Sequence, residues 1–478
     1  MPIPNISILS GNDKDLIHER SLDLLQEVGI KFNSKRAVTL LAEAGCHADW
    51  DSLAIKFPRE FIEKALTTLP AKILLAGKDP NKDVFCGNGS LVFCSPGGET
   101  MIRDIETRER RPANTEDLLT CLRVVESMPE IHEWCPMVIP MELPPRLRAL
   151  KTCQLSLCES SKHMLGSPET REELPYFLEM IDAVVGHRNR LKKRPIFSAI
   201  ASPVSPLQNS GAAVDNLLDM VEFTPPIFMQ FLPLSGATAP ITLAGTVVQA
   251  NAEFLGNMAL YQTATSGWPI IWAAAVGSID MRTGVYVGGP ETMLTTLSLI
   301  EMAKHYHVPV NTFGSSAAET QTIGYRTGME SMFGLLVSAL AQADHMWWPA
   351  DMDRLNTCDL PLTVMSTEAV RQIERMRKGF AFDETYMLFD TIKKMAFEAD
   401  YLGDPSTKKF FREEHLQPEL FPRVAYEEWS AAGKPTDESI AIARLKDMLS
   451  SYEPVLVDET IRHELESIYM SAEKKTLS

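Results

Sequence analysis

Aromatic residues recur where short apolar runs of this sequence end. Such rings suit one kind of ligand, because a quaternary ammonium spreads its charge over its methyl groups and offers no N–H donor. Proteins therefore hold it against aromatic faces, at about 0.5–2 kcal/mol per contact. The candidates are Phe231, Trp272, Phe313, Trp347 and Trp348. Packing in a hydrophobic core is the alternative for each ring. Because strand side chains alternate between faces, Trp347 and Trp348 cannot both point to one interior unless the strand has ended.

Polar groups accompany these rings at the ends of the same runs. His345 is the only histidine expected at such an end, where it would face the reacting part of a ligand or position a cofactor; a structural role is the alternative. Gln230 and Glu99 are expected near the bound cation. The other residues at these ends are uncharged, including Ser95, Ser167, Ser202 and Asn311. We therefore expect neither a lysine cluster nor a carboxylate pair at this site.

Metal ligation is not expected. Cys153, Cys158 and His163 are the nearest approach to a ligand set. The two cysteines are five residues apart on a predicted helix, so their side chains diverge by about 140°. They cannot share one tetrahedral zinc ion without breaking that helix.

The elements that must position these residues form a regular alternation. Eight short apolar runs are predicted strands: 91–95, 134–139, 163–166, 196–201, 227–232, 269–275, 308–313 and 343–348. Helical patterns lie between them at about 114–127, 145–160, 170–185, 211–223, 242–263, 290–305 and 324–341. This order predicts a TIM (β/α)8 barrel, whose active site is built at the C-terminal ends of its strands.

An open doubly wound sheet is the alternative to the barrel. It would normally show a glycine-rich fingerprint that opens a helix after its first strand. The nearest candidate here, GNGSLVFCSPGG, lies before and across a strand. We therefore predict an N-terminal helical and β extension over 1–90, a barrel over 91–355 and a C-terminal helical cap over 356–478, with helices at 364–379, 383–400 and 437–450.

Bulk composition restricts the class of partner. The chain has 478 residues, 46 basic against 63 acidic, for a formal net charge of -17. That balance argues against a nucleic-acid or anionic-membrane surface. The N-terminal segment lacks the pattern of a signal peptide, and there is no apolar run of about 18 residues that would span a membrane. The eight cysteines are scattered, so we expect free thiols and a cytoplasmic protein.

Four segments carry a resemblance that covers nearly the whole chain. They are SGATAPITLAGTVVQANAE (235–253), IRDIETRERRPANTEDL (102–118), SPVSPL (202–207) and HLQPELFPRVAYEEW (415–429). The first follows a predicted strand and opens a predicted helix, so it lies at a strand-to-helix turn on the ligand-binding face. In order and wording, the four segments resemble the trimethylamine methyltransferase superfamily.

That resemblance implies methyl transfer from a methylated amine to the Co(I) of a corrinoid (cobalamin), in one-carbon metabolism of the methanogenic or acetogenic type. The chain lacks the DxHxxG motif that binds corrinoids. The cofactor is therefore expected on a partner protein that docks over the barrel mouth. A symmetric homo-oligomer is also implied.

Leaving-group chemistry narrows the substrate. A quaternary ammonium departs as a neutral tertiary amine, whereas a tertiary amine must first be protonated or otherwise activated. Family members acting on trimethylamine carry pyrrolysine for this activation. This chain has ordinary residues in the corresponding segment, GSSAAETQTIGYRTGMES (314–331), with Gln321 at or near the special position.

The sequence therefore favours glycine betaine as the methyl donor, with dimethylglycine as the product. Proline betaine, carnitine, γ-butyrobetaine and trimethylamine are alternative substrates, and a catalytically silent betaine-binding relative is an alternative of another class. The carboxylate of a betaine needs hydrogen-bond donors. The candidates are Asn311, Thr312, Ser315, Gln321 and Arg326, the last also expected on a helix surface.

Overall fold

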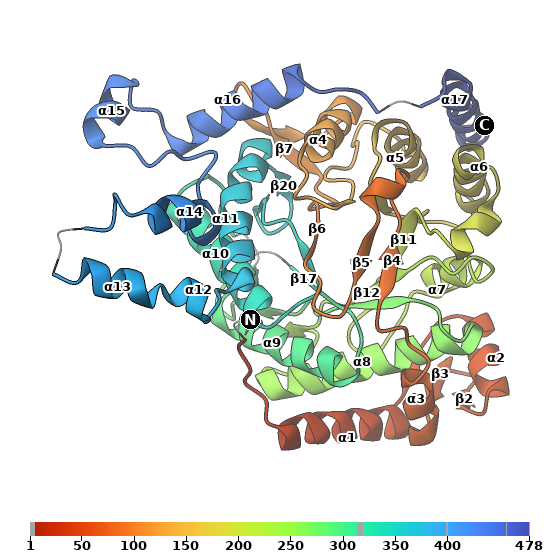
Figure 1. The fold of residues 1–478 in the computed structure, drawn as a ribbon. Helices are drawn as coiled ribbons and strands as arrows, with labels where there is room; N and C mark the ends of the chain where they lie inside the picture. Colours follow the sequence, from red (N-terminus) through yellow and green to blue (C-terminus); the bar gives the residue numbers. More distant parts are fainter. Residues whose placement is uncertain (1–4, 314–318, 398–399, 456, 478) are drawn as a thin grey trace.

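A closed barrel of eight parallel strands forms the centre of the computed structural model (Figure 1), which describes residues 5–313, 319–397, 400–455 and 457–477. The predicted TIM barrel is confirmed, and every predicted apolar run overlaps one barrel strand. In chain order the strands are β6 (Val92–Cys94), β9 (Glu133–Trp134), β10 (His163–Leu165), β11 (Phe197–Ala201), β12 (Ile227–Gln230), β14 (Ile270–Ala273), β17 (Val310–Thr312) and β18 (His345–Trp347). Pairing of β18 with β6 closes the ring.

Helices follow the strands and cover the outside of the barrel. They are α4 (Thr115–Ser127), α5 (Pro145–Glu159), α6 (Leu174–Val185), α7 (Gly211–Leu218), α8 (Leu243–Ala264), α9 (Pro290–His305), α10 (Tyr325–Leu340) and α11 (Leu360–Lys378). Local sequence sets their starts. At α4, for example, Asn114 and Asp117 cap each other's backbone N–H groups. Most of α8 is buried, because the N-terminal extension covers the side that would otherwise face solvent.

The N-terminal extension packs on α8 and closes one end of the barrel. Its helices are α1 (Gly11–Glu27), α2 (Lys35–Glu43) and α3 (Arg59–Leu66), joined by a small sheet of β1 (Ile30–Lys31), β2 (His47–Asp49) and β3 (Ala54–Lys56). A hairpin of β4 (Ile73–Leu75) and β5 (Val84–Cys86) follows. Side chains from this hairpin pack against the interior residues of the barrel, so it plugs the end at which the strands begin.

Two small sheets stand over the opposite end, where the strands terminate. One has the order β19 (Asp351–Met352), β20 (Thr357–Cys358), β7 (Met101–Arg103), β8 (Arg110–Pro112). The other contains β13 (Leu234–Ser235), β15 (Gly277–Ile279) and β16 (Tyr286–Val287). They are formed by the segments that follow β6, β12, β14 and β18, so they frame the barrel mouth.

The C-terminal region departs in part from the prediction. The predicted helix at 437–450 is α16 (Asp437–Ser450), but a further helix, α17 (Glu459–Leu477), packs on α5 and α6 and was not predicted. The predicted helix at 383–400 is interrupted at Leu388, which has a φ of 50° and separates α12 (Glu384–Met387) from α13 (Phe389–Met395). Two more short helices, α14 (Pro405–Glu414) and α15 (Tyr426–Ala431), follow. Whether the chain divides at 90 and 355 stays a prediction. Over the described ranges, none of the helices combines the length and apolar character needed to cross a membrane.

Alternation along the strands separates two sets of buried side chains. Val92, Cys94, Leu165, Phe228 and Trp347 belong to a cluster inside the barrel. Their sequence neighbours, such as Phe93 and Met346, belong to the larger cluster between the strands and the surrounding helices. The phase of each strand therefore decides whether a residue can reach a ligand at the mouth.

Candidate active site at the barrel mouth

Trp347 and Phe313 face each other at the inner surface of the mouth. Trp347 is the last residue of β18 and Phe313 directly follows β17, and their ring centroids are 6.4 Å apart. Trp348 points the other way, since its Nε1–H donates to the Thr363 carbonyl at 2.9 Å and its ring meets Phe93 edge-on. As expected from alternation, the two consecutive tryptophans do not both point into the barrel.

Two other predicted mouth aromatics belong to the core outside the barrel. Trp272 lies next to the interior residue Ile271, so alternation turns it outward, where it stacks on Phe254 of α8 with centroids 4.0 Å apart and an interplanar angle of 5°. Phe231 is 1% exposed and packs in the same outer cluster. Their placement at the mouth was wrong, because the sequence gives the strand but not its phase.

His345 lies deeper than predicted. It is the first residue of β18, not a residue at the end of that strand, and it is fully buried. Its Nδ1 lies 2.6 Å from the Asn311 side-chain nitrogen, and the oxygen of that amide accepts the Trp347 Nε1–H at 3.1 Å. With the amide fixed this way, Asn311 donates to His345 Nδ1. His345 therefore orients Asn311, and through it Trp347, from beneath the mouth.

Glu133 connects this histidine with a second one, at the plugged end of the barrel. Since His345 Nδ1 is an acceptor, its Nε2 carries the proton and donates to Glu133 Oε2 at 2.7 Å. The other carboxylate oxygen of Glu133 is 3.6 Å from His163 Nε2. His163 Nδ1 donates to the carbonyl of Ala76 at 3.0 Å, and its Nε2 accepts from the Ser198 hydroxyl at 2.7 Å. Burial lowers the pKa of His163, which is consistent with a neutral ring.

Glu133 was not singled out from the sequence, although it is an unusual residue for a barrel interior. The available signal was a carboxylate directly before the apolar run that begins at Trp134. Charged residues are almost never fully buried unless paired, so a carboxylate at the start of a buried strand predicts a buried hydrogen-bond network. His163 lies at the start of its strand, as predicted.

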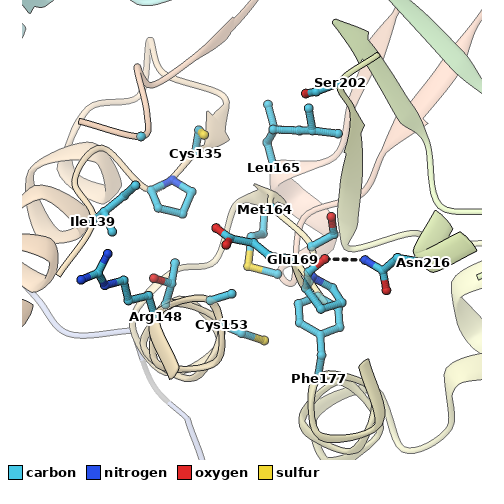
Figure 2. A pocket seen from close by; sticks show the side chains of 18 of the residues that line it. Cys135, Ile139, Arg148, Cys153, Met164, Leu165, Glu169, Phe177, Ser202 and Asn216 are labelled. Atoms are coloured by element: carbon cyan, nitrogen blue, oxygen red, sulfur yellow. Dashed lines mark hydrogen bonds between the residues drawn. The ribbon is translucent and has the colours of Figure 1, made fainter. Parts of the chain in front are cut away.

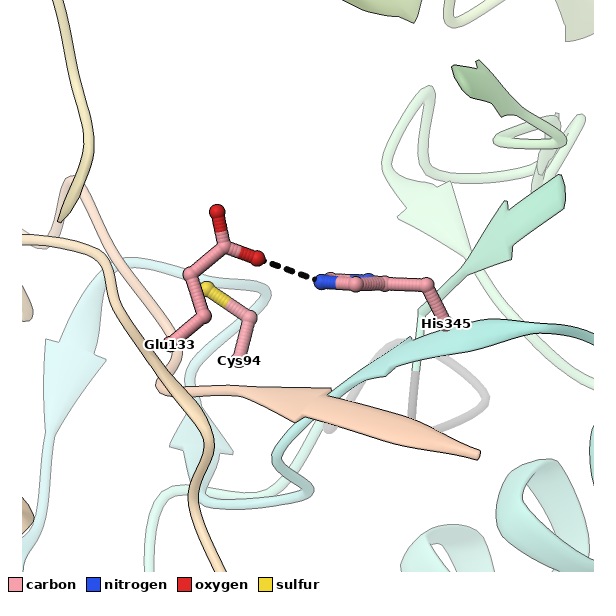
Figure 3. A group of neighbouring side chains, drawn as sticks. All are labelled: Cys94, Glu133 and His345. Carbon is pink, nitrogen blue, oxygen red and sulfur yellow. Dashed lines mark hydrogen bonds and ion pairs between the residues drawn. The ribbon is translucent and has the colours of Figure 1, made fainter. Parts of the chain in front are cut away.

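Cys94, Glu133 and His345 lie close enough together to be compared with a metal-binding site (Figure 3). One ligand atom from each lies within 4.8 Å of the others, and all three residues are buried. However, His345 Nε2 donates its proton to Glu133, and burial raises the pKa of the Cys94 thiol well above its ordinary value. A cation would have to displace protons from both groups, so the hydrogen-bonded arrangement fits the observed geometry better. Cys153 and Cys158 belong to no three-ligand group in the described part of the chain.

Two carboxyl groups lie buried over the mouth, where Glu99 alone was expected. Glu99 follows β6, and its backbone pairs with Met137 and Ile139 of the segment after β9. Asp351 follows β18, the neighbour of β6 in the barrel. Glu99 is 1% exposed and Asp351 is 5% exposed. Apart from Asp351, neither carboxyl oxygen of Glu99 has a hydrogen-bond partner among the described residues.

Burial acts against ionisation of both carboxyl groups of the Glu99–Asp351 pair. Burial, together with the adjacent Asp351, raises the pKa of Glu99 well above its ordinary value. Burial also raises the pKa of Asp351, while its bond with Glu99 acts in the opposite direction. Two carboxylates that share a dry site cannot both ionise easily. The expectation of no carboxylate pair was wrong, because Asp351 lies in a turn beyond the last strand, where periodicity gives no guide.

A cavity of about 410 Å³ opens beside the ends of β9, β10 and β11 (Figure 2). Most of its wall is apolar and includes Met164, Leu165, Phe177 and Ile200. Ser167 and Ser202, both expected at strand ends, line it, as does Gly98 beside Glu99. The aromatic candidates from the sequence do not.

Arg148 of α5 supplies a cation to the wall of this cavity. Its Nε donates to the Leu143 carbonyl at 2.9 Å and its Nη2 to the Met141 carbonyl at 3.1 Å, which fixes the guanidinium. Within the described residues, its Nη1 has no protein acceptor. Figure 2 shows Arg148 and Ser202 on opposite sides of the cavity. Sequence patterns gave no reason to select this arginine, because packing of α5 on the strand ends sets its position.

The other predicted polar residues divide between the mouth and the surface. Gln230 ends β12 in the same phase as the interior Phe228 and is half-buried. Gln321 is exposed, with its amide bonded to the Glu319 carbonyl at 2.9 Å. Arg326 is exposed on α10 and is ion-paired with Glu319 and Glu330.

Thr312 is one residue out of phase with Asn311, so its side chain leaves the barrel interior. Ser315 lies outside the described residues. Asn311 is inside, but both ends of its amide are already bonded. The predicted donors for a substrate carboxylate are therefore not free at the mouth, with Ser315 untested.

Comparisons with known proteins agree with this architecture. The trimethylamine methyltransferase (MTTB) family matches residues 1–477. A trimethylamine methyltransferase of Desulfitobacterium hafniense (strain DSM 10664 / DCB-2) is 27% identical over 465 residues, covering 97% of this chain and 93% of that protein. A glycine betaine methyltransferase of Desulfitobacterium hafniense (strain Y51) is 26% identical over 468 residues, covering 97% of each.

Among solved structures, the monomethylamine methyltransferase of Methanosarcina barkeri has a similar fold. The TM-score is 0.54 at 11% identity, with 95% of this chain and 90% of that chain covered. The match to the family profile extends over essentially the whole chain, from the N-terminal extension through the barrel to α17. The protein is therefore a methyltransferase and belongs to the trimethylamine methyltransferase family.

Proposed function

We propose that this enzyme takes a methyl group from a quaternary amine of the betaine class, glycine betaine first, and passes it to the Co(I) of a corrinoid carried by a partner protein. The tertiary amine, dimethylglycine in that case, is the product. One observation carries this proposal: Trp347 and Phe313 lie at the same mouth as a buried carboxyl pair, Glu99–Asp351, with which no lysine, arginine or histidine of the described residues forms an ion pair. An aromatic wall with a nearby negative charge suits a permanently charged nitrogen.

The chain's own residues bind and orient the substrate. Trp347 and Phe313 would receive the methylated nitrogen, and the carboxyl pair would supply the opposing charge. His345 acts as a positioning residue, since it holds Asn311 and thereby the indole of Trp347. No proton has to be delivered to the departing amine, because a quaternary nitrogen leaves neutral. This agrees with a mouth whose one histidine candidate is already engaged with Glu133.

We assign the carboxylate of the betaine to Arg148. Its guanidinium is fixed by two carbonyls and keeps one nitrogen directed to the cavity wall. Arginine binds carboxylates through charge-assisted hydrogen bonds. A betaine with a longer chain than glycine betaine, such as carnitine or γ-butyrobetaine, is the second candidate, because a largely apolar cavity contains Arg148 and would accommodate additional methylene groups.

The corrinoid would supply the nucleophilic cobalt. A cavity of about 410 Å³ is far too small for a corrin ring with its nucleotide tail. The ring must therefore meet the substrate from outside the barrel, which supports a partner protein as its carrier. A symmetric homo-oligomer is retained as a proposal from the family resemblance.

The test is a methyl-transfer assay with a reduced corrinoid protein and a panel of donors: glycine betaine, proline betaine, γ-butyrobetaine, carnitine and trimethylamine. Formation of methylcobalamin is followed by absorbance, and a betaine is expected to react while trimethylamine does not. Turnover of trimethylamine alone would contradict the substrate assignment. Thermal stabilisation by betaines without transfer would instead indicate a catalytically silent binding protein.

A further inference from the structure

Large apolar side chains lie in solvent along one projecting segment that the proposed function does not use. This segment, residues 380–397, contains α12 and α13, and we call it the arm. In Figure 1 the two helices extend outward beyond α10 and α11. Its exposed apolar residues are each at least 47% accessible to solvent and belong to neither core cluster of the described chain: Phe380, Phe382, Met387, Phe389, Ile392 and Phe397.

The apolar area of the arm is large for a surface that stays in water. With about 200 Å² for each phenylalanine, the four phenylalanines of this set expose on the order of 600 Å². The largest apolar patch on a typical monomer is roughly 300–600 Å². Met387 and Ile392 bring the total close to the roughly 800 Å² that one partner contributes to an interface of standard size. The arm is therefore expected to be covered by another protein surface.

The root of the arm is held by side chains, so the arm leaves the barrel in a defined direction. Arg375 of α11 donates from Nη1 to the Gly379 carbonyl and from Nη2 to the Glu414 carbonyl, both at 2.7 Å. Tyr386 packs on Phe410 of α14, with ring centroids 5.3 Å apart. The exposed phenylalanines are thus presented on a fixed support.

The arm begins at the plugged end of the barrel, away from the mouth. Arg377, in the last turn of α11, donates to the carbonyl of Gly89 at 2.9 Å, and Gly89 lies three residues before the start of β6. A corrinoid carrier must present its cofactor at the opposite end. A protein surface that meets the arm therefore leaves the mouth accessible, which favours a second copy of this chain over the carrier as the occupant.

Charge along the arm is arranged so that the arm complements itself. Asp383 and Glu384 lie at the start of α12, and Lys393 and Lys394 lie near the end of α13. The two lysines are 61% and 71% exposed, although each has a carboxylate of its own chain 3.4–3.9 Å away. When two such segments pack antiparallel about a two-fold axis, the acidic end of one lies beside the basic end of the other. Charges at the rim of an interface set the orientation of the partners more than their affinity.

We propose that the arm is a contact between two copies of this chain, in which α12 and α13 of one copy pack antiparallel on α12 and α13 of the other. The two-fold axis passes near Phe389, midway between the acidic and the basic end. The phenylalanines form the apolar centre of this contact, and the charged ends fix its direction. The inference goes beyond the proposed function and does not depend on it, because neither the methyl donor nor the corrinoid takes part.

Light scattering after size-exclusion chromatography measures the mass of the full-length protein. We expect at least twice the 53.2 kDa of one chain, and Phe389→Ser combined with Ile392→Ser should halve the measured mass. Trp50→Ser is the matched control, because Trp50 is a comparably exposed apolar residue outside the arm, at 55%. It should leave the mass unchanged, and the melting temperature of each variant shows that it is folded.

Charge variants test the antiparallel arrangement. Lys393→Glu with Lys394→Glu makes both ends of the arm acidic, whereas Glu384→Lys with Thr385→Lys makes both ends basic. Asp383 is retained in both variants because its side chain caps α12. Like charges then meet in each variant alone, so the dissociation constant of the pair should rise about tenfold or more. An equimolar mixture of the two variants should regain the wild-type mass.

A cross-link locates the axis without removing the charged ends. All eight native cysteines are buried, so the thiol introduced by Phe389→Cys is the accessible one. Near the axis it should form a disulfide with the same residue of the second copy on mild oxidation with copper phenanthroline. The cysteine of Thr385→Cys lies away from the axis and should not form this link.

A wild-type protein with the mass of one chain at micromolar concentration would overturn the inference. So would a mixture of the two charge variants that stays dissociated. Arm variants that keep the wild-type mass but raise the KM for the corrinoid protein would assign the arm to the carrier instead. None of these results bears on which amine donates the methyl group, so this inference and the proposed function fail independently.

Discussion

The two ends of the barrel treat buried charge in opposite ways. At the plugged end, the Lys162 ammonium donates to the carbonyls of Met128 and Ile131 at 2.7 and 2.6 Å and also to that of Val125. Asp344 at the same end accepts from the Lys304 ammonium and from the backbone of Gly89 and Val310.

At the mouth, Glu99 and Asp351 are as deeply buried, and among the described residues neither forms an ion pair with a lysine, arginine or histidine. The buried charges at the plugged end are met by hydrogen-bond partners within the chain, which offsets part of the cost of burying them, whereas a buried carboxylate without such partners is retained at a cost to stability. The difference marks the plugged end as structural and the mouth as the place where a ligand completes the charge balance.

The largest loss of stability should come from removing the buried Lys162 ammonium at the plugged end. Lys162→Met leaves three buried carbonyls without their donor, at about 1–3 kcal/mol for each unsatisfied group, so we expect the free energy of unfolding to fall by about 3–5 kcal/mol in all. Chemical denaturation measures this change. Lys35→Met, at an exposed lysine on α2, is the control and should stay within about 0.5 kcal/mol. Equal stability of the two variants would show that the plugged end does not depend on this charge.

Substitution of two tryptophans, one in the outer core and one at the mouth, distinguishes the roles of these two regions. Trp272→Leu removes the ring stacked on Phe254, so it should lower the free energy of unfolding by about 2–4 kcal/mol. Because this ring faces away from the interior, the Kd for tetramethylammonium should not change. Trp347→Leu should instead raise the Kd for tetramethylammonium about tenfold, the equivalent of an aromatic contact of about 1–2 kcal/mol. Loss of affinity in the Trp272 variant alone would place the cation elsewhere.

A smaller effect should appear in the acid stability of the plugged end. His132 Nδ1 accepts the Phe93 N–H at 3.1 Å, so protonation of the ring breaks this bond. Burial lowers its pKa to about 4, below the ordinary 6.5. The unfolded chain therefore binds more protons between these values, and stability is lost as pH falls from 6.5 to 4.

His132→Asn should flatten this part of the melting-temperature profile, by an amount on the order of 1 kcal/mol. The exposed His47 offers the control His47→Asn, which should leave the profile unchanged. A wild-type slope that survives in the His132 variant would assign the acid sensitivity to other groups.

The smallest effect is expected from chelation. Because the His345 proton is bonded to Glu133, dialysis against EDTA should change neither the melting temperature nor methyl transfer. Elemental analysis of the untreated protein provides the control. A drop in melting temperature that zinc reverses, and that is absent in Cys94→Ser, would show that the interior cluster holds an ion.

Sequence patterns predict the barrel, but they place only some of the residues at its mouth correctly. Apolar runs located all eight strands, and alternation correctly separated Trp347 from Trp348. Which side chains of a strand point inward can be predicted only if the first residue of the strand is known, and the sequence does not fix that residue. For this reason Trp272 was misplaced and His345 was expected too near the end of β18. Asp351 lies in a turn, where only tertiary contacts fix the neighbours of a side chain.

The hairpin of β4 and β5 fills the end of the barrel at which the strands begin, so within the described residues the mouth is the open end. The methyl donor, the methyl acceptor and the released amine would then all pass through the barrel mouth. If a carrier protein covers the mouth during the reaction, the methylated amine has to bind before the carrier protein docks. The demethylated product then cannot leave until the carrier protein dissociates. Turnover would follow a compulsory order, and the lifetime of the complex between the two proteins would set its upper limit.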